Sequence, residues 1–144
     1  LLYSGAKYWR NGMQPKTTLT IVSAIGLIFS SVMFLAPEFV TREQFPNAEG
    51  QGFVDLVTLR YAIASLILAL VIISFHLRDI TGHAFQIQVM RGYTLAFGVV
   101  CITNLALQLA GKISAVPPIV GTGVIAVLSF LTWRSLVSRA KEEV

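Results

Sequence analysis

The clearest candidate for a chemical role is Arg60, a charged side chain that lies well inside a long apolar run. A charge within a membrane-spanning helix is costly unless it is paired, although near a helix end a long arginine side chain can reach the lipid headgroups. At about 100° per residue, Arg60 points away from the helix face that carries Ala62, Ser65 and Ala69. We therefore expect Arg60 to contact a lipid headgroup or a partner protein. An interior ion pair or anion site would require that helix face to be assigned wrongly.

Two uncharged polar residues, Asn104 and Gln108, lie one helical turn apart in another apolar run. A side-chain amide in lipid is costly without a hydrogen-bond partner. We expect both amides to bond across the bundle, to Ser30, to Thr58 or to exposed carbonyl groups. One alternative is that they hold a small polar headgroup in a cavity, and another is that they contact a second subunit.

Other residue types give little sign of catalysis. His76, Asp79 and His83 are close in sequence, but their spacing is unselective for a metal, and we expect them to be interfacial polar residues. Cys101 is the single cysteine, which excludes an intrachain disulfide or a site built from several thiolates. The sequence has no catalytic triad, paired carboxylates or phosphate-binding loop. We therefore expect no catalytic residues and no metal, and the sequence identifies no cofactor, ligand or pigment.

The elements that must position these residues are membrane-spanning helices. The chain has 144 residues, of which 55% are hydrophobic and 12% are charged, whereas an ordinary soluble domain is about 25% charged. This composition excludes a disordered chain, a nucleic-acid-binding module and most soluble enzymes. Apolar runs close to the roughly 20 residues that cross a bilayer occur four times. They extend over Leu19–Ala36, Val54–Phe75, Gly92–Ala110 and Val116–Trp133.

Each apolar run carries a stripe of small or weakly polar residues at helical spacing, which favours close packing between membrane helices. We expect the stripes to meet in an all-α, integral membrane four-helix bundle, and the sharper alternative is that they line a ligand cavity. In chain order, the stripes are Ser23, Gly26, Ser30 and Met33; Thr58, Ala62, Ser65, Ala69 and His76; Thr94, Phe97, Cys101, Asn104 and Gln108; and Pro118, Thr122, Ala126, Ser129 and Trp133.

Basic residues are unevenly distributed between the two sides of the expected membrane. Eight lie before the first run, between the second and third, or after the fourth, whereas Arg42, Arg60 and Lys112 lie on the other side. The positive-inside rule then places both termini in the cytoplasm, with Trp9 and Trp133 at the same inner interface. The expected organisation is an N-terminal interfacial segment over residues 1–18, a four-helix domain over 19–136 and a short cytoplasmic tail over 137–144.

Short motifs mark the ends of these runs. Ala36-Pro37-Glu38 closes the first, Leu59-Arg60-Tyr61 lies near the start of the second, Arg91-Gly92 opens the third, and a short proline-containing hairpin leads into the fourth. With these motifs, residues 19–136 resemble a family of short bacterial membrane proteins that have four spans and no established function. A second similarity is to the DoxX-like small membrane proteins. The resemblance implies a helical bundle in the bacterial inner membrane and adds no activity.

Three hypotheses about function follow from the sequence. The first is a non-enzymatic accessory or structural subunit that packs against larger membrane proteins and lipids, because catalytic groups and a water-exposed domain are lacking. The alternative is a small binding or transport protein for a lipophilic or anionic compound, anchored by Arg60, Asn104 and Gln108, which predicts a cavity at the depth of Asn104. A membrane enzyme acting on a lipid near Asp79 ranks last. The expected partners are membrane lipids and a larger membrane complex, and no nucleic acid.

Overall fold

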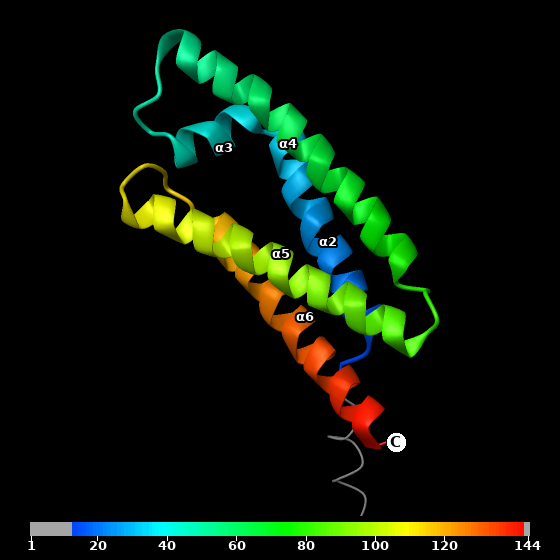
Figure 1. Ribbon diagram of the computed structural model, residues 1–144. Helices are drawn as coiled ribbons and strands as arrows, with labels where there is room; N and C mark the ends of the chain where they lie inside the picture. The colour runs from blue at the N-terminus through cyan, green and yellow to red at the C-terminus, as the bar shows by residue number, and fades with distance from the viewer. Residues whose placement is uncertain (1–12, 143–144) are drawn as a thin grey trace, which may run out of the picture.

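The computed structural model describes residues 13–142, and its secondary structure is entirely helical over that range (Figure 1). The helices are α2 (Pro15–Leu35), α3 (Pro37–Gln44), α4 (Gly50–Leu77), α5 (His83–Leu109) and α6 (Val116–Glu142). All except α3 are long and apolar enough to cross a membrane. The predicted all-α architecture, with four helices long and apolar enough to cross a membrane, is therefore confirmed for the described residues.

The helices extend beyond the predicted apolar runs at several ends. α2 begins at Pro15, so the last part of the predicted interfacial segment belongs to this helix, and residues 1–12 lie outside the described residues. α5 begins at His83 rather than at Gly92. α6 continues to Glu142, so most of the predicted tail is a continuation of that helix. Hydropathy marks where a helix crosses lipid, whereas the backbone hydrogen bonds continue into the polar flanks.

The polar segment after the first span contains a helix, α3, that was not predicted. Ala36 leaves the helical region at φ −137° and ends α2, and Pro37 occupies the first turn of α3. Proline suits that position because a first-turn amide has no helical acceptor. In the connection between α5 and α6, Gly111 follows α5 with a φ of +65°. Glycine adopts this left-handed conformation without a Cβ clash, and α5 ends within one residue of the predicted run that closes at Ala110.

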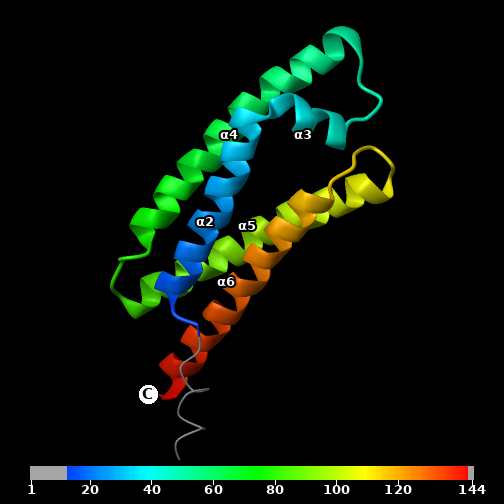
Figure 2. The ribbon, with the colours of Figure 1, turned by 180° about the vertical axis from the view of Figure 1, so that it is seen from behind.

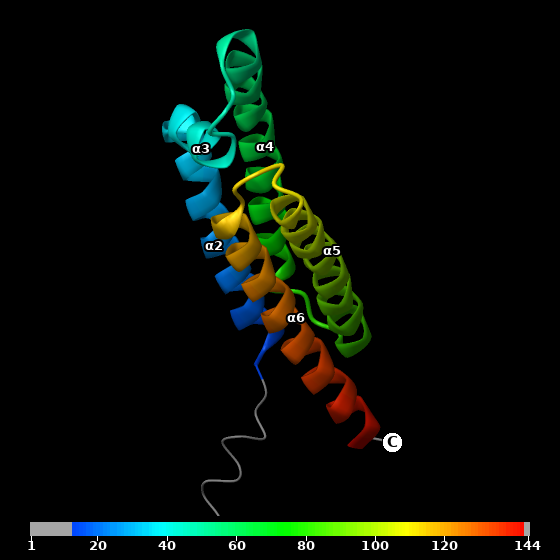
Figure 3. The same ribbon diagram turned by 90° about the vertical axis from the view of Figure 1, so that its left-hand side faces the viewer.

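The long helices form two hairpin pairs, α2 with α4 and α5 with α6 (Figure 1). α2 lies between α4 and α6 and joins the pairs (Figure 2). By contrast, α4 and α5 are consecutive in the chain but make almost no contact along their lengths. Both ends of the described chain lie at one end of the bundle, here called the terminal end (Figure 3). The opposite end, here called the α3 end, holds α3 and the α5–α6 connection.

The pairs converge at the terminal end, where most of the buried apolar core lies. This core contains Leu19, Val22, Met90, Tyr93, Ile125 and Leu136. Two hydroxyl pairs, each 2.6 Å apart, lie in the same half of the bundle: Thr18 with Thr132, and Ser74 with Tyr93. Thr132 and Ser74 each give their one hydrogen to a carbonyl of their own helix, so Thr18 and Tyr93 are the donors. These bonds hold α2 to α6 and α4 to α5 near the terminal end.

The predicted small-residue stripe is correct for α2 and wrong for α4. On α2, Ser23, Ser30 and Met33 are buried. On α4, the predicted stripe from Thr58 to His76 is exposed, and the buried side chains belong to a different face: Arg60, Ala64 and Ser74.

The hydroxyl groups on the exposed face of α4 find acceptors within their own helix. Thr58 donates to the Val54 carbonyl at 3.0 Å, and Ser65 donates to the Tyr61 carbonyl at 2.8 Å. A hydroxyl that is bonded to the preceding turn needs no partner from another helix. Small polar residues on this helix therefore do not indicate the packed face.

Candidate functional site

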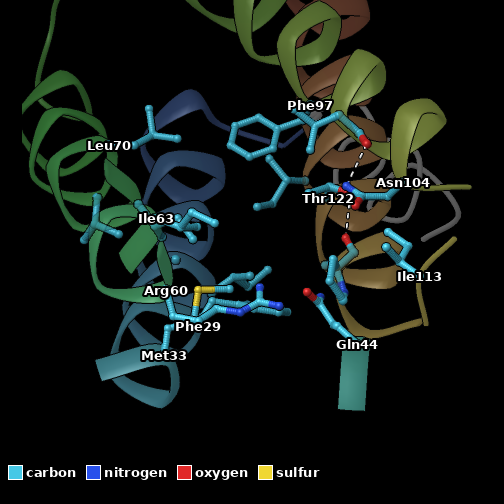
Figure 4. Close-up of a pocket in the computed structure, with 18 of the residues that line it drawn as sticks. Phe29, Met33, Gln44, Arg60, Ile63, Leu70, Phe97, Asn104, Ile113 and Thr122 are labelled. Carbon is cyan, nitrogen blue, oxygen red and sulfur yellow. Dashed lines mark hydrogen bonds between the residues drawn. The ribbon is translucent and has the colours of Figure 1, made fainter. Parts of the chain in front are cut away.

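A cavity of about 490 Å³ lies between the two helix pairs, and all five helices contribute to its wall (Figure 4). Its lining is mostly aliphatic and aromatic. The polar residues of the wall are Gln44, Arg60, Ser74, Asn104 and Thr122. A mainly apolar cavity of this volume with a few polar groups is typical of small-molecule sites.

Arg60 is the charged residue of this wall, and it is only 5% exposed. Its Nε donates to Oγ1 of Thr41 on α3 at 3.3 Å, and its guanidinium carbon lies 5.5 Å from the centre of the Phe45 ring. Its Nη2 is buried and has no hydrogen-bond partner. Among the described residues, Arg60 forms no ion pair.

The predicted outward direction of Arg60 was therefore wrong. The prediction took Ala62, Ser65 and Ala69 as the packed face of α4, but that face is exposed. Arg60 instead shares the inward face with Ala64 and Ser74, which follow it at helical spacing. An interior anion site at Arg60 required the packed face of α4 to be assigned wrongly, and that assignment was wrong. Whether Arg60 also contacts lipid or a partner stays a prediction.

The structure separates the three polar residues that were expected to bond with one another. Ser30 donates to the Ala64 carbonyl at 3.0 Å and joins α2 to α4. Asn104 lines the cavity but donates to the Val100 carbonyl of its own helix at 2.9 Å. The Gln108 side-chain oxygen accepts from the Ala115 amide at 3.2 Å, at the start of α6. The predicted bonds from Asn104 and Gln108 to Ser30 or Thr58 are therefore wrong, although Ser30 does bond across the bundle.

Asn104 and Arg60 belong to different helix pairs and lie on different walls of the same cavity (Figure 4). This arrangement fits the predicted cavity at the depth of Asn104. Gln108 lies outside the cavity lining, so it is not an anchor for a ligand there.

Residues of α3 and the loop after it complete the site, and the sequence reasoning missed them. Thr41 supplies the acceptor for Arg60, and Gln44 and Phe45 form part of the cavity wall. The Ser114 amide donates to the Gln44 carbonyl at 3.0 Å, so α3 is tied to the α5–α6 connection. A proline followed by an acidic residue is a helix-start signal, so Pro37-Glu38 could have revealed α3.

The polar residues near the terminal end do not form a cluster. His76 contacts the Ile72 carbonyl at 2.9 Å, and His83 contacts the Leu136 carbonyl at 3.0 Å. Asp79 instead accepts hydrogen bonds from Lys16 at 2.8 Å and from Arg78 at 3.3 Å, which lower the pKa of its carboxyl group. Within residues 13–142, no three potential metal-ligating side chains come together.

The cavity combines one cationic group with a mainly apolar wall. Arg60 offers a buried cationic donor, and apolar side chains surround it. A carboxylate or phosphate oxygen is the acceptor that a guanidinium binds best. No protein-family model, curated protein or solved structure matches this chain, so the function has to be inferred from the site itself.

Proposed function

We propose that the protein binds, without transforming it, an amphiphilic compound with an anionic group in the cavity between its two helix pairs. The observation that carries this proposal is the buried Nη2 of Arg60, which has no partner at the wall of a cavity. A buried N–H group without an acceptor costs about 1–3 kcal/mol or more when it is charged, because its desolvation is uncompensated. An anionic oxygen that binds the guanidinium group from the cavity offsets this cost.

The rest of the cavity favours a ligand with a lipophilic part. Branched and aromatic side chains such as Ile25, Phe29, Ile67 and Phe97 form most of the wall. Burial of apolar ligand surface against them contributes roughly 25 cal/mol per Å². A small hydrophilic anion would leave this surface unused, whereas an amphiphile uses both the guanidinium and the apolar wall.

The location that we propose is the inner membrane of a bacterium, with both termini in the cytoplasm. Its support is the excess of basic residues in the segments that flank the terminal end, including Lys16, Arg78 and Arg134. In this orientation α3 and Arg60 belong to the half of the bundle that lies toward the cell exterior.

The test compares anionic amphiphiles with a neutral one on the purified full chain. Palmitate, palmitoyl lysophosphatidate, dipalmitoyl phosphatidate and hexadecanol are offered to the detergent-solubilised protein, and bound ligand is quantified by native mass spectrometry. Arg60→Gln is compared with Arg42→Gln, which removes an exposed arginine at the same end of the bundle. We expect Arg60→Gln to weaken binding of at least one anion by about tenfold or more, because a charge-assisted bond is lost.

Arg42→Gln should bind like the wild type, and hexadecanol should bind weakly to every variant. If the folded Arg60→Gln protein retains all three anions as well as the wild type does, the proposal is wrong.

The hypothesis of an accessory subunit stays a prediction. Large apolar side chains on the outside of the bundle, such as Leu66, Val99 and Leu109, are already accounted for by lipid contact. A protein that co-purifies from native membranes in fixed stoichiometry would support it, and such a protein could still deliver or receive the bound amphiphile.

A further inference from the structure

We infer that the ligand is an anionic lipid of the bilayer, which enters the cavity sideways through an opening between α4 and α5. This inference rests on the proposed function and deepens it, because it names the source of the amphiphile and its route. In this arrangement the headgroup binds Arg60 inside the cavity, and the hydrocarbon part extends through the opening into the surrounding lipid.

The side of the cavity between α4 and α5 is open. These two helices make almost no contact along their lengths. Both carry cavity-lining residues that are substantially exposed: Leu59 at 53% and Leu70 at 36% on α4, and Val100 at 45% and Leu107 at 40% on α5. Because these four residues line the cavity and are also exposed, we call them the rim of the α4–α5 opening.

The opposite side of the cavity, between α2 and α6, is closed. Phe29 of α2 packs so closely against α6 that a Cβ at Gly121 would lie 2.8 Å from its ring. Nearer the terminal end, the hydrogen bond between Thr18 and Thr132 joins the same two helices. These contacts hold α2 against α6 at two levels and leave the α4–α5 side as the route into the cavity.

Chain segments also cover the two ends of the cavity. At the α3 end, Gln44 and Phe45 belong to the wall, and the Ser114–Gln44 backbone bond joins the two helix pairs. At the terminal end, the Ser74–Tyr93 bond and the apolar core bring the pairs together. When the four long helices cross a bilayer, the sides of the bundle face lipid and its ends face water. The α4–α5 opening therefore leads to lipid.

The chemistry of the opening favours a lipid over a water-soluble anion. Its rim consists of leucine and valine side chains, which give a hydrated ion nothing to replace its water. A lipid already has its hydrocarbon part at this depth. Arg60 lies in the half of α4 nearer the α3 end, so it is also on the side of the headgroups of that leaflet. A carboxylate or a phosphate on the lipid provides the anionic oxygen that a guanidinium binds best.

The register of α4 and α5 shows where the hydrocarbon part of the lipid passes. The two helices run in opposite directions, and the Ser74–Tyr93 bond fixes their alignment. Because Val100 follows Tyr93 by two helical turns, it lies between the level of this bond and the level of Arg60. A lipid whose headgroup binds Arg60 and whose chains leave through the opening therefore contacts Val100.

The test places a photo-reactive side chain on the rim and identifies the lipid that it captures. p-Benzoylphenylalanine replaces Val100, or as a matched control Val99, which is 64% exposed but lies outside the cavity lining. The full chain is reconstituted in dioleoyl phosphatidylcholine vesicles that contain a minor fraction of oleate or of dioleoyl phosphatidate. Captured lipids are quantified by mass spectrometry after irradiation.

We expect at least one of the two anions to be enriched at position 100 by about tenfold or more over its fraction in the vesicle, because it gains a charge-assisted bond. Capture at position 99 should follow the composition of the vesicle. Arg60→Gln should abolish the enrichment at position 100, whereas Arg42→Gln should leave it unchanged. Inorganic phosphate in large excess should not reduce it, and displacement of the lipid by phosphate would assign the site to a water-soluble anion and overturn the inference.

The outcomes separate this inference from the proposed function. If position 100 captures lipids in the proportions of the vesicle while binding in detergent still depends on Arg60, the lateral route is wrong and the proposed function stands. Equal enrichment at positions 99 and 100 would show that the anion collects on the outer surface, which also contradicts the inference. If no anion depends on Arg60 in either experiment, both proposals are wrong. The same side chain at Leu70 repeats the test from the α4 rim if the Val100 variant does not fold.

Discussion

Arg60 on α4 donates a hydrogen bond from Nε to Oγ1 of Thr41 on α3, over 3.3 Å, and so joins a long apolar helix to the short helix at the end of the cavity. The Thr41 hydroxyl gives its one hydrogen to the Pro37 carbonyl at 2.8 Å, so its oxygen meets Arg60 as an acceptor. Thr41 is fully buried, at 0% exposure. The position of α3 and the orientation of the guanidinium are therefore coupled.

Replacement of Thr41 by valine keeps the shape of the side chain and removes the acceptor. Because Arg60 Nε would then be buried without a partner, we expect Thr41→Val to lower the free energy of unfolding by about 1–3 kcal/mol. Chemical unfolding in detergent, followed by circular dichroism, measures this change. Thr20→Val is the control, because Thr20 is exposed and bonds to the Lys16 carbonyl of its own helix. Equal stability of Thr41→Val and Thr20→Val would show that the bond to Arg60 does not stabilise the fold.

The contact between α2 and α4 depends on the absence of a side chain at Gly26. A Cβ at this position would lie 2.6 Å from Cγ2 of Val71, and a valine side chain has little rotational freedom in a helix. We expect Gly26→Ala to destabilise the protein by about 1–3 kcal/mol through overpacking.

The matched substitution is Gly98→Ala on α5, where an added Cβ would meet nothing within 4 Å. That variant should be as stable as the wild type or more stable by up to about 1 kcal/mol, since alanine favours a helix over glycine. If the two alanine variants have the same stability, α2 and α4 do not pack closely at Gly26.

Asn104 should matter more for binding than for stability. Its amide donates to a carbonyl of its own helix, so Asn104→Leu should change the free energy of unfolding by less than about 1 kcal/mol. The same change removes a polar group from the cavity wall, and we expect binding of the anionic amphiphiles to weaken by about fivefold. Gln88→Leu, at an exposed position near the other end of α5, is the control. A large loss of stability with unchanged binding would contradict this division.

The terminal end has a pH-dependent contact on its surface. Hydrogen bonds from Lys16 and Arg78 hold the pKa of Asp79 below its ordinary value of 3.8. A carboxyl group with a lowered pKa stabilises the fold above its unfolded-state pKa, and this contribution is lost as the pH falls through its folded-state pKa. We expect wild type to resist unfolding slightly better than Asp79→Asn at neutral pH, with the difference shrinking as the pH falls below about 4 and disappearing only below the folded-state pKa.

The Asp79 difference should also shrink in high salt, because both side chains of the Lys16–Asp79 pair are more than half exposed. Unfolding curves of the two proteins at about pH 7 and pH 3, each in low and high salt, provide the check. A difference that is equal at both pH values would show that ionisation of Asp79 does not cause it.

The proposed orientation in the membrane predicts which loops are accessible from outside the cell. In a Cys101→Ala background, Asn47→Cys between α3 and α4 should react with a membrane-impermeant thiol reagent in intact cells. Ser138→Cys near the end of α6 should react only after the cells are opened. Labelling of position 138 in intact cells would contradict the proposed topology.

The four long apolar helices could be predicted from the sequence because each depends on a local property, a run of apolar residues of sufficient length. The face of α4 could not be predicted by the same reasoning. Thr58 and Ser65 look like packing residues, yet each hydroxyl is bonded within its own helix and can face lipid. The true inward face is marked by Arg60, the residue that hydropathy alone would place outside.

The candidate site was predictable in part. The sequence singled out Arg60 and Asn104, and both line the cavity, but Thr41 and Gln44 lie in the segment between the first two predicted runs, for which no helix was predicted. The cavity itself depends on how the α2–α4 and α5–α6 pairs diverge, which is a relation between distant segments. No local pattern of residues encodes that divergence directly.

The bond that joins α3 to the α5–α6 connection runs from the amide of Ser114 to the carbonyl of Gln44, so it involves backbone atoms alone. Its strength is therefore largely independent of which side chains occupy the two positions. The side chains at both positions can therefore change over evolution without loss of this hydrogen bond. Ser114→Pro removes the donor, because proline has no amide hydrogen. We expect position 114 to accept any of the other nineteen amino acids during evolution, but not proline.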